Sequence, residues 1–267
     1  VRPFRVQDEL ERGRIVIVAG FQGTSYRREI TTLGRGGSDL TAVALAGALG
    51  AEACEIYTDV DGVLTADPRI VPAATKIESL SYDEMEALAR GGAKVLHRDA
   101  IAWARRTGVA LYSRSTFVPD SEGTLVRQNP PPRPSPVVGI TGRKDLYLID
   151  ADLALTEAVE AMLADIPTAG RTQSATGVRY LLTREDLHEA ESLAAELTAL
   201  GARVQTPVGS VSVVGSGLGE DRQTYRTILT HLSGFEGILT GTVWTAFMAP
   251  SQVDAVVMAL HRDLLEG

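Results

Sequence analysis

The sequence has a single cysteine, few aromatic residues and no long hydrophobic run. Cys54 stands alone among 267 residues, which excludes an internal disulfide and a zinc site built on paired cysteines. No apolar stretch reaches the roughly eighteen residues that a membrane-spanning helix needs. Positive charge is also scarce, because 26 Lys and Arg face 34 Asp and Glu, and this argues against a general nucleic-acid binder. We therefore expect a globular protein of the reducing cytoplasm that contacts neither nucleic acid nor membrane.

A proline-rich segment divides the chain. Residues 129–136 contain five prolines, which fits neither a helix nor a central strand. Such a run favours a semi-rigid extended linker, although a surface loop within one domain has the same composition. We expect one domain over residues 1–128 and further modules after the linker.

Before the linker, strand and helix patterns alternate. Residues 14–20 form a continuous apolar run typical of a buried parallel strand. The sequence from Ser81 to Glu84 predicts a capping box at a helix start. Further predicted elements are a helix over 38–49, a strand over 54–58, a helix over 97–106 and a strand over 109–112. This order predicts an α/β sheet with crossover helices.

After the linker the pattern repeats with a period of about sixty to seventy residues. The first round has strands over 137–149 and 177–183 and helices over 155–163 and 187–200. The second has strands over 210–215 and 242–248 and helices over 224–232 and 252–265. We expect two α+β modules of ferredoxin-like type, over residues 137–206 and 207–267.

Residues 31–39 carry the first candidate site. Three glycines allow close backbone approach to a ligand, and the loop leads into a helix N-terminus that favours an anion. Arg35 suits a carboxylate and Asp39 an ammonium group, so the loop could hold a zwitterion. The alternative is a plain glycine-rich turn in which Ser38 caps the helix.

Residues 57–69 carry the second candidate site, at the end of a predicted strand. Its aspartates could hold magnesium through water, and Arg69 could pair with phosphate oxygens. Asp, Gly and Pro also form ordinary solvated turns, so a plain loop remains the alternative. Lys94 follows two glycines and could reach a phosphate, although it could equally be a surface residue.

Together these segments resemble the amino-acid kinase family, and within it the aspartate kinases. The resemblance rests on residues 31–39, 57–63, 65–69, 92–97 and 114–117. The two C-terminal modules are similar to the paired ACT domains of aspartate kinases. The resemblance implies part of a three-layer α/β kinase domain, without its N-terminal portion, followed by two ferredoxin-like ACT modules.

The resemblance also implies residue roles. Substrate binding falls to Arg35, Gly36, Gly37, Ser38 and Asp39. ATP binding falls to Thr58, Asp59, Leu64, Thr65, Asp67, Pro68, Arg69 and Lys94. Asp39 and Lys94 would be catalytic, and no residue is assigned as a metal ligand. The implied reaction transfers the γ-phosphoryl group of ATP, with Mg²⁺, to the side-chain carboxylate of L-aspartate. It begins lysine, threonine and methionine biosynthesis.

The sequence departs from the family at several points. The family's N-terminal lysine and glycine-rich segment has no counterpart, which motivates an alternative: a non-catalytic, amino-acid-binding regulatory subunit. Leu64 replaces a usual aromatic residue, and residues 153–155 replace the proline-glycine pair at the effector turn. Lysine or threonine is the expected effector. ACT pairing implies a homodimer or association with a full-length kinase subunit.

Overall fold

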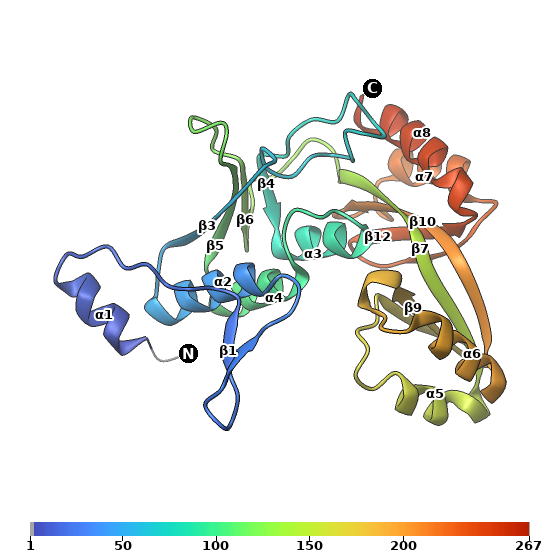
Figure 1. The fold of residues 1–267 in the computed structure, drawn as a ribbon. Coiled ribbons are helices and arrows are strands. Elements are labelled where there is room, and N and C mark those ends of the chain that lie inside the picture. The colour runs from blue at the N-terminus through green and yellow to red at the C-terminus, as the bar shows by residue number, and fades with distance from the viewer. Residues whose placement is uncertain (1–2, 267) are drawn as a thin grey trace.

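Three sheets and their helices organise residues 3–266, the part of the chain that this computed structural model describes (Figure 1). A four-stranded sheet and a six-stranded sheet are the large ones, and the third is a two-stranded hairpin. None of the helices within residues 3–266 combines the length and apolar character needed to span a membrane.

The four-stranded sheet has the order β3–β5–β6–β4, with β3 and β5 parallel and β5 and β6 antiparallel. Its strands are β3 (Ala53–Thr58), β4 (Ser79–Ser81), β5 (Ala110–Ser115) and β6 (Thr124–Arg127). Its helices are α2 (Gly37–Leu49), α3 (Tyr82–Gly91) and α4 (Arg98–Thr107). These positions confirm the α/β fold class and each predicted helix and strand between 38 and 112. The capping box also forms, since Ser81 and Glu84 exchange side-chain and backbone hydrogen bonds.

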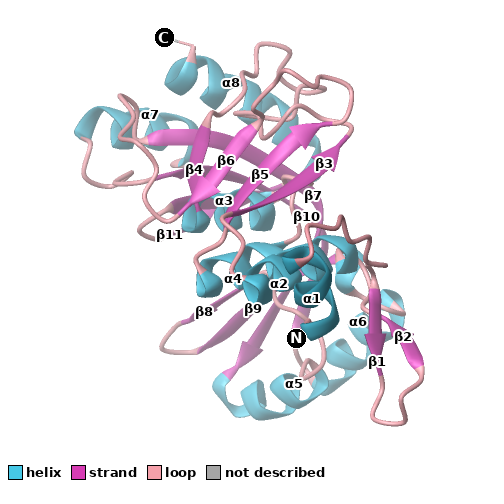
Figure 2. Ribbon diagram, turned by 90° about the vertical axis from the view of Figure 1, so that its left-hand side faces the viewer, coloured by secondary structure: helices cyan, strands magenta, loops and turns pink. Residues whose placement is uncertain are grey.

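The buried strand predicted over residues 14–20 does not form. This segment has no regular secondary structure, and Ile15 and Ile17 are each 95% exposed. The end of the segment is held at α2 instead of the sheet, because the Phe21 N–H donates to Thr41 Oγ1 at 3.1 Å, and among the described strands β3 pairs only with β5. The segment instead connects α1 (Phe4–Glu11) to a hairpin of β1 (Gln22–Thr24) and β2 (Ile30–Thr32), which projects from the molecule (Figure 2).

The six-stranded sheet has the order β11–β12–β10–β7–β9–β8 and all its pairs are antiparallel. Its strands are β7 (Val137–Asp152), β8 (Gly170–Gln173), β9 (Gly177–Thr183), β10 (Arg203–Gly215), β11 (Glu236–Leu239) and β12 (Val243–Met248). Its helices are α5 (Thr156–Met162), α6 (Ala190–Leu200), α7 (Arg222–Leu232) and α8 (Val253–Leu265), with short 3₁₀ turns at η1 (Leu153–Leu155), η2 (Arg184–Asp186) and η3 (Pro250–Gln252). Every helix and strand predicted after the linker is present.

The long strands β7 and β10 run through both ferredoxin-like modules. Residues 146–152 of β7 pair with β9, and residues 203–208 of β10 complete that first sheet. Residues 137–143 of β7 pair instead with 210–215 of β10, next to β12, and so supply a strand of the second module. The register shifts near Pro207, where β10 passes between modules. The boundaries 137–206 and 207–267 remain a prediction, and they do not represent this sharing of β7.

The proline-rich segment is anchored to the four-stranded domain. Arg133 donates a hydrogen bond to the Ser79 carbonyl at 2.7 Å and pairs with the Glu84 carboxylate, which is 2% exposed. Helix α3 lies between the two large sheets, and the side chains of Val138 and Val214 join its hydrophobic core. The proline-rich segment and α3 therefore fix the six-stranded sheet against the four-stranded domain.

Candidate functional site

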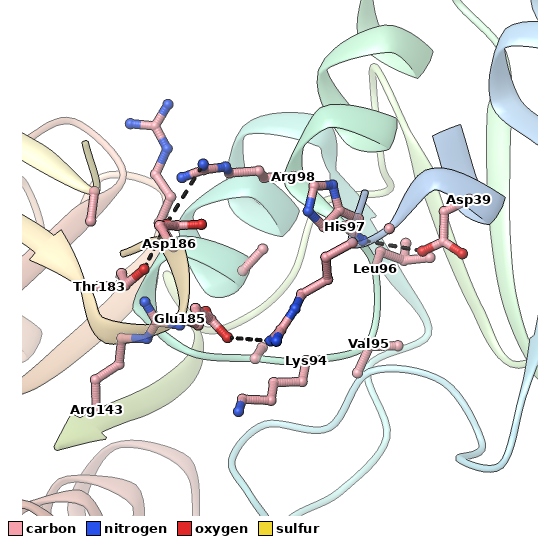
Figure 3. Close-up of a pocket in the computed structure, with 16 residues that line it drawn as sticks. Asp39, Lys94, Val95, Leu96, His97, Arg98, Arg143, Thr183, Glu185 and Asp186 are labelled. Atoms are coloured by element: carbon pink, nitrogen blue, oxygen red, sulfur yellow. Dashed lines mark hydrogen bonds and ion pairs between the residues drawn. The ribbon is translucent and has the colours of Figure 1, made fainter. Parts of the chain in front are cut away.

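A cavity of about 240 Å³ lies between the four-stranded domain and the first ferredoxin-like module (Figure 3). Arg35, Gly36 and Asp39 line it from the start of α2, and Lys94 lines it from the segment after α3. The six-stranded sheet and its connections contribute cavity-lining residues from β7, β9 and η2, among them Arg143, Thr183, Glu185 and Asp186. The predicted substrate loop and the predicted phosphate-binding Lys94 thus line one cavity. The turn η2 lines it as well, although the sequence did not indicate a role for this turn.

The glycine-rich loop depends on Gly36. Its φ of 72° lies in the left-handed region, and a Cβ there would lie 2.1 Å from the His97 ring. Gly36 is the N-cap of α2 and no side chain caps this helix, so the predicted cap at Ser38 is wrong. Ser38 lies instead inside the first turn. Asp39 lies in the same turn, where a negative charge is favourable, and its Oδ2 accepts a 3.4 Å hydrogen bond from the His97 N–H.

Arg35 reaches across the cavity to the other domain. Its Nη1 donates to Glu185 Oε2 at 3.1 Å, while Glu185 Oε1 accepts from Arg143. The Arg143 side chain is only 8% exposed, whereas that of Arg35 is 74% exposed. Burial alone would raise the pKa of Glu185, but the hydrogen bond from Arg143 and the charges of Lys94 and Arg35 outweigh it and lower that pKa. Glu185 is therefore a fixed anion beside the arginine expected to bind substrate.

The nucleotide segment lies elsewhere, at and beyond the carboxyl end of β3. Thr58 Oγ1 donates to Asp59 Oδ1 at 3.0 Å, and the Thr58 carbonyl accepts from the Thr116 N–H at 2.9 Å. Asp67 and Arg69 form a mutual ion pair, with Nη2 and Oδ2 2.6 Å apart. This hydrogen bond lowers the pKa of Asp67, and the Arg69 side chain is 85% exposed.

Among the residues predicted to bind the nucleotide in this segment, Thr65 differs from the others because it is buried. Its residue is 8% exposed, and its Oγ1 lies 2.9 Å from His261 Nε2 and accepts from the Thr75 N–H at 3.0 Å. Its hydroxyl is thus engaged within the protein. Leu64 is partly buried and forms an isolated bridge with Lys76, on the neighbouring chain segment.

The structure therefore brings together Arg35, Gly36, Asp39 and Lys94 but not the whole predicted site. The remaining nucleotide residues do not line this cavity: Thr58, Asp59, Leu64, Thr65, Asp67, Pro68 and Arg69. Gly37 is buried inside the helix start, and Ser38 is exposed beside the cavity. The residue roles themselves remain predictions. Glu185, Asp186 and Arg143 were missed, and no local motif marks them, since Arg35 and Glu185 are 150 positions apart.

The aspartates do not form a magnesium cage. Within residues 3–266, no group of three or more His, Cys, Asp or Glu side chains is arranged to hold a metal. Asp61 is engaged with Lys76 at 3.0 Å, and Asp67 is engaged with Arg69. The carboxylates of residues 3–266 alone thus do not fit a dedicated Mg²⁺ site.

Comparison with known proteins identifies the class. The model of the amino acid kinase family matches residues 4–112. An aspartokinase of Thermus thermophilus is 36% identical over 98% of this chain and 70% of its own length. Aspartokinase 2 of Bacillus subtilis is 40% identical over 79% of this chain and 55% of its own.

The fold agrees with solved structures of the same class. Aspartokinase III of E. coli in complex with aspartate and ADP matches with a TM-score of 0.82, 29% identity, and coverage of 97% of this chain. The chain spans 63% of that structure's length. The same enzyme in complex with lysine and aspartate matches with a TM-score of 0.75 at 29% identity. The chain is thus an amino-acid kinase by class, and it belongs to the aspartokinase family.

Proposed function

We propose that this chain binds L-aspartate and ATP and takes part in transfer of the γ-phosphoryl group to the side-chain carboxylate of L-aspartate. The observation that supports this most is the convergence of Arg35, Asp39 and Lys94 on one cavity. A zwitterionic amino acid needs a cation and an anion at fixed spacing, and Arg35 and Asp39 supply both from one loop. The E. coli relative with aspartate and ADP bound has the same fold.

The residues would act by positioning and charge. Arg35 offers its guanidinium to the α-carboxylate, and Asp39 accepts the ammonium group. The side-chain carboxylate oxygen then attacks the γ-phosphorus, and ADP leaves with the bridging oxygen. Lys94 neutralises charge that spreads over the phosphoryl oxygens. Mg²⁺ would enter on the nucleotide's phosphates and neutralise part of their charge, since the chain's carboxylates do not form a cage for it.

The six-stranded sheet is the proposed regulatory part. Its two ferredoxin-like modules would bind an amino-acid effector, with lysine and threonine as the candidates, and pair with a second copy or a full-length kinase subunit. A cavity of about 530 Å³ runs along β7, β8 and β9, and its wall holds the Asp150 carboxylate and the Arg179 guanidinium, which pair with each other at 2.5 Å. An amino-acid effector would bind there by exchanging its own ammonium and carboxylate groups for this pair. Residence in the cytoplasm remains a prediction.

A non-catalytic regulatory subunit is the second candidate. The observation that favours it is a difference in strand pairing between the six-stranded sheet and the N-terminal part of the chain. The described strands of the six-stranded sheet all pair into two modules, whereas residues 14–20 pair with none of the described strands. Such a subunit would bind an amino acid without turnover.

ADP release with Mg²⁺-ATP and L-aspartate tests the proposal, with D-aspartate and L-glutamate as controls. Calorimetric titration of L-aspartate into the protein tests binding separately. Arg35→Ala should weaken L-aspartate binding about 10- to 100-fold, because a hydrogen bond to a charged group contributes about 1.5–3 kcal/mol. Arg171→Ala, at an exposed ion pair elsewhere, is the matched control. Lysine binding without L-aspartate binding or turnover would favour the regulatory subunit, and equal L-aspartate binding by both variants would refute the assigned site.

A further inference from the structure

The last helix of the chain reaches the nucleotide segment directly. His261 lies on α8 in the second module and is 1% exposed. Its Nε2 lies 2.9 Å from Thr65 Oγ1, across 196 positions of sequence, and its Nδ1 lies 2.7 Å from Glu266 Oε1. This buried contact joins a helix of the second module to the proposed ATP segment.

The donors and acceptors in this contact form a consistent chain. The Glu266 carboxylate can only accept, so Nδ1 of the imidazole donates to it. In the neutral imidazole Nε2 is then an acceptor, and the Thr65 hydroxyl donates to it. The same hydroxyl oxygen accepts from the Thr75 N–H at 3.0 Å. The three hydrogen bonds that connect Thr75, Thr65, His261 and Glu266 thus each have one donor and one acceptor.

The backbone of Thr65 also closes the segment of residues 65–75 and ties it to β7. Its N–H donates to the Thr75 carbonyl at 2.9 Å, and its carbonyl accepts from the Ile140 N–H of β7 at 2.8 Å. Between these ends, Ala66 and Val71 lie in the same hydrophobic core as Leu260 of α8, whereas Arg69 is exposed. The orientation of the Asp67–Arg69 pair therefore depends on how α8 holds Thr65 and these apolar neighbours.

We infer that His261 is a positioning residue for the nucleotide segment, acting through Thr65. Helix α8 holds this segment in the orientation that binds the nucleotide phosphates, so a movement of α8 changes nucleotide affinity. The inference rests on the proposed function, in which residues 64–69 bind ATP. His261 itself touches no reactant in this arrangement.

Four variants and one control test the inference by calorimetric titration with ADP and, separately, with L-aspartate. Thr65→Val keeps the shape of the side chain and removes the hydroxyl, and His261→Leu removes the acceptor. Each should weaken ADP binding about 3- to 10-fold, the value of one net hydrogen bond, and leave L-aspartate binding within twofold. Thr65→Ser should restore ADP binding. The double variant should bind ADP no more weakly than Thr65→Val, because Thr65→Val already removes the bond to His261 along with the bond from the Thr75 N–H.

His231→Leu is the matched control. His231 lies on α7 of the same module, and its Nε2 lies 2.8 Å from Oδ2 of Asp263 on α8. The change therefore removes a histidine–carboxylate bond to the same helix that does not pass through Thr65. ADP binding by His231→Leu should equal that of the unmodified chain. If all variants lose ADP and L-aspartate binding in parallel, or if none loses ADP binding, the positioning role is refuted.

A protein that binds L-aspartate but no ADP would refute the proposed nucleotide site rather than the contact itself. Amide hydrogen exchange then decides the positioning claim. Thr65→Val and His261→Leu should each accelerate exchange within residues 65–75 and leave β3 unchanged, and His231→Leu should not. Unchanged exchange at 65–75 would overturn the claim that His261 holds this segment.

Discussion

Removing Arg133 should destabilise the protein strongly, although Arg133 lies in a proline-rich linker. Its partner Glu84 has a side chain 3% exposed and sits at the N-terminal cap of α3. Removing one partner of a buried pair costs about 3–5 kcal/mol. Glu84 retains hydrogen bonds from the Ser81 N–H at 2.8 Å and hydroxyl at 2.9 Å, and Arg133 is 26% exposed. We therefore expect Arg133→Ala to cost about 2–3 kcal/mol, slightly below that range.

The assay is thermal unfolding followed by calorimetry. At about 2–4 °C per kcal/mol, Arg133→Ala should lower Tm by about 4–12 °C. Arg171→Ala is the control, because the Arg171 and Glu160 side chains are 59% and 46% exposed and such a pair contributes about 0–1 kcal/mol. Glu84→Gln combined with Arg133→Ala should cost less than the sum of the two single changes. A loss for Arg133→Ala no larger than that for Arg171→Ala would refute the reasoning.

Three further outcomes are expected. Glu185→Gln should strengthen L-aspartate binding about two- to fivefold in calorimetry, because it releases the exposed Arg35 from a competing carboxylate. Weaker binding by this variant would mean that Glu185 instead orients Arg35 for the substrate. Burial and nearby carboxylates raise the pKa of Cys54 to about 11, so iodoacetamide at pH 8.5 should label the folded protein far more slowly than the unfolded protein, and equal rates would contradict this. Gly123→Ala should lower the free energy of unfolding in urea by about 4 kcal/mol or more, because its Cβ would lie 1.9 Å from a backbone carbonyl oxygen. Gly108→Ala, with φ 74° and open space around it, should lower it by about 1–2 kcal/mol. Similar losses for the two variants would contradict the steric argument.

Local patterns in the sequence predict most of the regular structure. The capping box at Ser81 and the period of apolar residues depend on neighbours within a few positions, and those neighbours are visible in the sequence. Residues 14–20 show the limit of the method. An apolar run indicates a strand only if a second strand lies beside it, and none of the described strands pairs with this run.

The candidate site was predictable only in its contiguous parts. The loop from Arg35 to Asp39 and the position of Lys94 follow from local composition and from the family resemblance. Arg35 contacts Glu185 and Thr65 contacts His261 across 150 and 196 positions of sequence, respectively. Local sequence patterns carry no signal for contacts at such separations. These two contacts depend on how the six-stranded sheet docks, which is set by α3, β7 and Arg133.

The sharing of β7 and β10 also has a consequence for the order of folding. Residues 137–143 can pair with residues 210–215 only when the intervening chain is already brought back on itself. The cost of closing that loop falls if the first module folds earlier, because its own strands place the two ends side by side. We therefore expect the first module to fold before the second one. The second module then forms on strands β7 and β10, which the first module has already paired.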